Sequence, residues 1–86
     1  MGKQKRVYKV SINSIDAVKT FAEKAMKATN IDIDLVYGRF VINGKSLLGI
    51  FSLDLTKTLD MVVWYDESSV AEANEFEDAI KNMIIM

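Results

Sequence analysis

Hydrophobic and polar residues alternate near the start of the chain and then change to a helical period. In residues 7–12, Tyr8, Val10 and Ile12 alternate with Lys9 and Ser11, which is typical of a strand with one buried face. An Asn-Ser pair, which favours a helix cap, leads into a helical period over residues 16–28. The apolar stripe of this segment consists of Val18, Phe21, Ala22, Ala25 and Met26. We therefore expect a strand followed by an amphipathic helix.

The middle of the chain predicts two strands and a short helix. Residues 31–37 alternate, with apolar side chains at every odd position and aspartates at residues 32 and 34. Gly38 allows a tight turn into a short strand at residues 40–42, which ends at Gly44. Residues 46–53 predict a short apolar helix with Ser46 as its N-cap.

The last third of the chain predicts one more strand and one more helix. Residues 60–65 are rich in β-prone side chains, and Trp64 among them is expected to pack beneath a helix. A polar turn follows at residues 66–69. The apolar stripe of the final helix, expected over residues 71–84, consists of Phe76, Ala79, Ile80, Met83 and Ile84.

The resulting order, β-α-β-β-α-β-α, predicts an α+β fold. Helices with one apolar stripe each are expected to cover one face of a four-stranded, mainly antiparallel sheet, which gives an open-faced two-layer sandwich. No linker or repeat divides the 86 residues, so we expect one domain over residues 1–86.

The amino-acid composition excludes several kinds of catalysis and metal binding. The chain has no cysteine and no histidine, which excludes thiol catalysis, histidine catalysis and the commonest zinc ligands. No nucleophile–base pair, metal cluster or phosphate-binding loop can be assembled, so we expect no enzyme, no metal and no cofactor. Net charge is −1 and no apolar stretch is long enough to span a bilayer. We expect a cytoplasmic protein, a monomer or weak dimer, with protein partners instead of nucleic acid or membrane.

One stretch of sequence carries a family resemblance. Residues 45–53 read Lys-Ser-Leu-Leu-Gly-Ile-Phe-Ser-Leu, and Lys57, Asn43 and residues 34–37 also fit the same pattern. The sequence resembles the HPr phosphocarrier family of the bacterial sugar phosphotransferase system over residues 7–64, and more loosely beyond them. Asp54 and Thr58 stand where that family commonly has glycine.

The active segment of the family, Gly-Leu/Ile-His-Ala-Arg-Pro, is degenerate in this chain. In one register Ile15 takes the place of the histidine and Ala17 that of the arginine; in the other, Asp16 takes the place of the histidine. Phosphoryl transfer by this family needs an imidazole nucleophile and a cation that steadies the phosphate. An acyl phosphate on Asp16 is the remote alternative to a simple first-turn acid. We expect no phosphohistidine chemistry.

The resemblance implies two functions that do not need histidine. Ser46 corresponds to a serine that an ATP-dependent HPr kinase phosphorylates, and the chain is similar to the catabolite-repression HPr branch, which lacks the histidine and keeps the serine. A phosphate there would add roughly −1.5 to −2 charges at a helix start, for a partner to bind. The alternative is that Ser46 is a helix cap and nothing more.

The second implied function is docking through Leu47, Leu48 and Phe51. Leu47 and Phe51 are four residues apart, so they share one face of a helix. Spacing alone favours burial of all three, whereas the resemblance implies an exposed surface that binds enzyme I or transcriptional regulators. Thr20 and Lys24 are expected to form its rim.

Three function classes follow. The first is a regulatory module switched by Ser46 phosphorylation, and the second is a structural or partner-binding subunit without phosphorylation. The third is an RNA-binding sheet, suggested by Gly38-Arg39-Phe40-Val41. That motif needs several aromatic residues, and only Phe40 is present, so we favour the first class.

Overall fold

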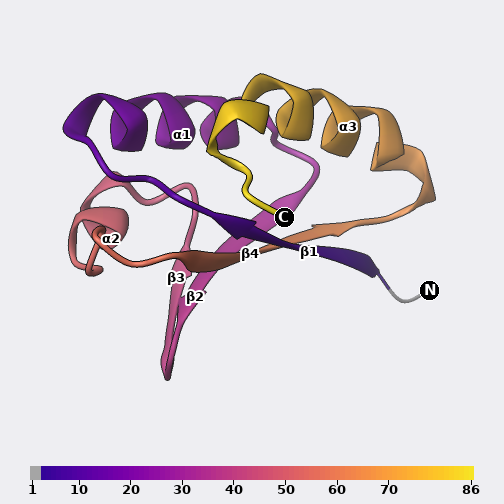
Figure 1. Ribbon diagram of the computed structural model, residues 1–86. Coiled ribbons are helices and arrows are strands. Elements are labelled where there is room, and N and C mark those ends of the chain that lie inside the picture. The colour runs from indigo at the N-terminus through magenta and orange to yellow at the C-terminus, as the bar shows by residue number, and fades with distance from the viewer. Residues whose placement is uncertain (1–2) are drawn as a thin grey trace.

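The computed structural model describes residues 3–86, and Figure 1 shows two helices lying over one face of a sheet. A turn of 3₁₀ helix precedes the last α-helix, and another follows it. The elements in chain order are β1 (Gln4–Val10), α1 (Ile15–Lys27), β2 (Asp32–Tyr37), β3 (Phe40–Asn43), α2 (Leu47–Phe51), β4 (Leu59–Tyr65) and α3 (Val70–Ala79).

The sheet has the strand order β1-β4-β2-β3, and all of its pairs are antiparallel. The chain is therefore an α+β fold in which α1 and α3 pack on one face of a four-stranded antiparallel sheet (Figure 1). Both the element order and this topology are consistent with an HPr-like open sandwich. The fold predicted from the hydrophobic pattern is confirmed.

The core lies between the helices and the alternate residues of the strands. Strand β4 buries every second side chain, from Leu59 to Tyr65, because these side chains face α1 and α3. Phe21 of α1 and Phe76 of α3 meet edge to face, with ring centroids 5.6 Å apart, and this contact joins the two helices above the sheet.

Two element boundaries differ by three residues or more from the predicted ones. The first strand begins at Gln4 instead of residue 7, because β4 is long enough to pair with it as far as Tyr65. The final helix ends at Ala79, which is exposed, instead of continuing to residue 84. The residues after it turn back to the edge of β1, where the N–H of Ile85 donates to the carbonyl of Lys9 at 2.7 Å. This non-local pairing replaces the last turn of the expected helix.

Trp64 does not pack beneath a helix, and that prediction is wrong. Its neighbours Val63 and Tyr65 face the helices, so Trp64 points to the opposite side of the sheet. There its indole N–H donates to a carboxylate oxygen of Asp34 at 3.0 Å, and the ammonium of Lys5 lies 5.5 Å from the ring centroid. The sequence of β4 has apolar residues on both faces, so its hydrophobic pattern does not show which face is buried.

Two glycines have different physical roles. Gly38, between β2 and β3, has φ of 59°, which only glycine adopts without strain. Gly44 is a site of close approach, since a Cβ atom there would lie 2.7 Å from Cγ2 of the buried Ile33. Within residues 3–86, no helix has the length and apolar character that crossing a membrane requires.

Candidate functional site

The short helix α2 is held in place at its start by a tight network. The N–H of Lys45 donates to the side-chain oxygen of Asn43 at 2.9 Å, and the N–H of Ser46 donates to the Asn43 carbonyl at the same distance. Ser46 is the N-cap: its Oγ accepts the N–H of Gly49 at 3.1 Å. Gly49 lets α2 lie close to β3, because a Cβ atom there would stand 2.7 Å from Cγ2 of Ile42.

The side chains of α2 divide into buried anchors and an exposed apolar set. Ile50 is fully buried, and Leu53, just after the helix, is nearly so. Leu48 is 82% exposed, whereas Leu47 and Phe51 are 36% and 39% exposed. We call Leu47, Leu48 and Phe51 the α2 patch. The structure places all three at the surface, the orientation that the resemblance implies and that spacing alone does not favour.

A groove between α1 and α2 extends this apolar surface. Its volume is about 350 Å³, and Leu47 from α2 faces Lys19, Glu23 and Met26 from α1 across it. Met26 is 54% exposed, so its assignment to the buried stripe is wrong. It lies at the edge of that stripe, on the side of α1 that faces α2. Met26 and Lys19 border the α2 patch. The sequence alone could not identify them, because their place beside the patch depends on where α2 packs against α1.

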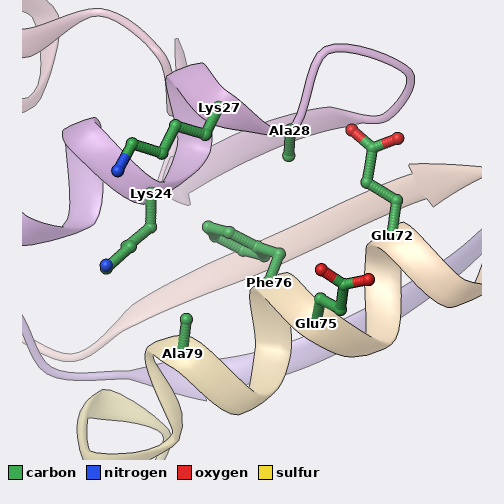
Figure 2. A pocket seen from close by; sticks show the side chains of 7 residues that line it. All are labelled: Lys24, Lys27, Ala28, Glu72, Glu75, Phe76 and Ala79. Atoms are coloured by element: carbon green, nitrogen blue, oxygen red, sulfur yellow. The ribbon is translucent and has the colours of Figure 1, made fainter.

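Of the two residues expected to form the rim, Lys24 lies on another side of α1. Thr20 is exposed, and Lys24 is partly buried on the side of α1 that faces α3. Figure 2 shows Lys24 on the α1 side of a second groove, with Phe76 and Ala79 of α3 on the other side and Glu72 and Glu75 farther along α3. Helical spacing explains the error, because Lys24 and Met26 are two residues apart and point to opposite sides of α1.

The degenerate active segment forms the start of α1. Ser14 is the N-cap, and its Oγ accepts the N–H of Ala17 at 3.0 Å. Ile15 presents a hydrocarbon side chain that is 63% exposed, and Asp16 is a solvent-exposed acid in the first turn. Among residues 3–86 no group of acidic side chains could hold a metal beside Asp16. The segment therefore has an acid, Asp16, that the helix dipole stabilises, and it has no imidazole nucleophile.

The surroundings of Ser46 leave its hydroxyl at the surface. Ser46 is exposed, whereas the ammonium of the neighbouring Lys45 is directed inward and donates to the carbonyl of Ile31 at 2.7 Å. This hydrogen bond connects the turn before α2 to the residue that precedes β2. An added group on Ser46 would project into solvent next to Leu47.

Asp54, just after the buried Leu53, forms hydrogen bonds within its own turn. The Asp54 carboxylate accepts the hydroxyl O–H of Thr56 at 2.6 Å and the backbone N–H of Thr56 at 3.1 Å. These hydrogen bonds hold the pKa of Asp54 below its usual value. The aspartate therefore closes the turn that follows α2.

The chain matches no known family model, and a search of curated proteins gives no relative at a significant level of similarity. The features of the chain that bear on function are therefore the α2 patch, Ser46 and the resemblance of residues 45–53.

Proposed function

We propose that this chain is an HPr-like regulatory module that docks a protein partner through the α2 patch and is switched by phosphorylation of Ser46. It carries no phosphohistidine, because neither Ile15 nor Asp16 supplies an imidazole. The resemblance of residues 45–53 names HPr kinase and a transcriptional regulator as the partners to test.

The exposure of the α2 patch is the observation that supports this proposal. Leucine and phenylalanine side chains are stabilised by about 1.5–3 kcal/mol when fully buried, and here three of them stay at the surface of one short element. The buried Ile50 and Leu53 already anchor α2, so the 82% exposed Leu48 adds little to the fold. Exposed apolar clusters with polar borders are typical of protein contact sites.

Ser46 connects modification to this surface. A phosphate would place about −1.5 to −2 charges on the residue that precedes Leu47. A phosphate oxygen keeps the capacity to accept the Gly49 N–H, so α2 need not refold. A partner with an apolar pocket beside an arginine would distinguish the two forms, because arginine binds phosphate in a charge-assisted, bidentate manner.

Docking is tested by the binding of purified HPr kinase to the immobilised chain. We expect Leu48→Asp to weaken binding strongly, since it places a charge in the centre of the α2 patch. Val41→Asp is the matched control, because Val41 is also an exposed apolar residue but lies on strand β3, outside the α2 patch. Equal binding by the wild type and Leu48→Asp would contradict the proposed surface.

The second candidate is a partner-binding subunit without phosphorylation. The hydrogen bond from Gly49 to Ser46 supports it, because a capping serine needs no further role. In that case Ser46→Asp and Ser46→Ala bind a transcriptional regulator equally well, whereas the regulatory module predicts different affinities for the two variants.

A further inference from the structure

Strand β3 forms one edge of the sheet, and its outer backbone groups are open. Gly44, just after β3, donates its N–H to the carbonyl of Ile33 at 2.7 Å. Hydrogen bonding alternates along an antiparallel pair, so Ile42 and Phe40 also bond to β2, and the N–H and C=O of Val41 point away from it. In the part of the chain that the structure describes, no other segment bonds to the backbone of Val41.

The side chains of β3 do not protect this edge. Edge strands usually carry charged residues, prolines or bulges, or lie beneath another segment, because an open strand pairs readily with a second chain. The sequence of β3 is Phe-Val-Ile-Asn, which has neither a charge nor a proline. Phe40 and Val41 are 64% and 62% exposed, more than any other large apolar side chain in the strands. Strand β3 is therefore an open, uncharged edge.

The opposite edge of the sheet, β1, is protected by charge and by a covering segment. It carries Lys5, Arg6 and Lys9. The N–H of Lys9 donates to the carbonyl of Met86 at 2.9 Å, and the N–H of Ile85 donates to the carbonyl of Lys9 at 2.7 Å, so the end of the chain covers part of this edge. On a second copy, the uncharged open edge that β3 can meet is therefore β3 itself.

We propose that two copies of this chain pair antiparallel through β3, about a two-fold axis that passes between their Val41 residues perpendicular to the sheet. The pairing joins the two sheets into one continuous antiparallel sheet. The helices of both copies lie on the same face of it, because rotation about this axis does not turn the sheet over. The two Val41 residues exchange their outward N–H and C=O bonds. The contact is isologous and closed, as in most soluble homo-oligomers.

The side chains of β3 select the register of this pairing. With Val41 on the axis, Phe40 of each copy lies opposite Ile42 of the second, and both side chains are on the same face of the joined sheet. An aromatic residue opposite a β-branched one stabilises a strand pair, and the two-fold axis forms this contact twice. The neighbouring registers with the same hydrogen-bonding pattern would instead set Phe40 opposite Gly44, or Ile42 opposite Gly38, and lose this contact.

Charge complementarity favours a second copy over an unrelated extended segment. In this register Arg39 of one copy is level with Asn43 of the second, and the β2 neighbour of that Asn43 is Asp34. Within residues 3–86, neither Arg39 nor Asp34 has an ion-pair partner. The two residues then lie two strands apart, about 10 Å between backbones, which brings the Asp34 carboxylate within reach of the long arginine side chain. A second copy thus supplies both the apolar contact and the opposite charge.

Sedimentation velocity over a wide range of protein concentration tests the proposal. We expect the average mass to rise from 9.7 kDa toward twice that value. Val41→Pro should remain a monomer, because it removes an N–H that only the dimer uses, and proline is tolerated where the N–H of an edge strand points outward. Val7→Pro is the matched control: Val7 is an exposed valine on the other edge, its N–H points outward as that of Lys9 does, and self-association should be unchanged. Far-ultraviolet circular dichroism verifies that both variants are folded.

Amide hydrogen exchange of the wild type gives a second readout that needs no variant. The N–H of Val41 should become protected as the protein concentration rises, whereas the N–H of Val7 should not. Phe40→Ser should raise the dissociation constant by about tenfold, because it removes both contacts with Ile42. A mass of 9.7 kDa at every concentration would overturn the proposal. So would a dimer that folded Val41→Pro still forms, and so would exchange at Val41 that does not depend on concentration.

Discussion

Leu48 and Ile50 are two residues apart on α2, and Leu48 is 82% exposed whereas Ile50 is fully buried. One short element therefore contains both an anchor to the core and a side chain available to a partner. This division separates stability from docking in a way that single substitutions can measure.

The first prediction compares these two residues. Leu48→Ala should change the free energy of unfolding by less than about 0.5 kcal/mol, because little surface is buried there. Ile50→Ala should lower it by about 2–5 kcal/mol, since it leaves a cavity in the core. Urea unfolding measures both. A loss of several kcal/mol in Leu48→Ala would show that Leu48 is a core residue in solution.

The second prediction concerns the cap at Ser46. Ser46→Ala removes the acceptor for the Gly49 N–H and should lower the free energy of unfolding by about 1 kcal/mol. Ser46→Asp supplies a carboxylate acceptor at the same place, so its loss should be smaller. Thermal unfolding of the two variants gives the comparison. Complete unfolding of Ser46→Ala would mean that the residue is required for folding, which leaves the switch without its main support.

The third prediction concerns the close approach at Gly44. A Cβ atom there meets Cγ2 of the buried Ile33 at 2.7 Å and the backbone oxygen of Ile33 at 3.1 Å. Gly44→Ala should therefore lower the free energy of unfolding by about 1–3 kcal/mol. Gly38→Asn is the control, because nothing lies near Gly38 and asparagine, after glycine, adopts a positive φ at the lowest cost. Similar losses in the two variants would contradict a steric origin.

The fourth prediction is a pH dependence at Glu72. Its carboxylate accepts the backbone N–H and the side-chain amide of Asn30, at 3.1 and 3.0 Å, and these bonds hold the pKa of Glu72 below its usual 4.5. Because the pKa is lower in the folded state, the stabilisation is present above pH 4.5 and is lost as the pH falls through the folded-state pKa. The wild type should exceed Glu72→Gln in stability at neutral pH, and the difference should shrink in acid. A difference that stays constant or grows in acid would exclude this linkage.

The local features of the chain could be predicted, because each depends on neighbouring residues. The alternation around Leu35, the stripe through Phe21 and the cap at Ser46 follow from period and side-chain chemistry, and the structure confirms all three. These elements alone were enough to predict an antiparallel sheet covered by helices.

Features that depend on distant contacts could not be predicted in the same way. The last helix stops early because residues near Ile85 pair with β1, and Trp64 faces away from the helices because its strand is apolar on both sides. Lys24 and Met26 were placed incorrectly around α1, because their surroundings depend on where α2 and α3 pack.

The most direct test of the proposed switch is incubation of the chain with HPr kinase and ATP, followed by intact-mass spectrometry and peptide mapping. The proposal predicts one phosphate on Ser46, which Ser46→Ala loses and Ser52→Ala retains. An HPr with a known phosphorylatable serine, present in the same tube, shows that the kinase is active. The switch would be contradicted if the control HPr became phosphorylated and this chain did not. A phosphate at a residue other than Ser46 would contradict it as well.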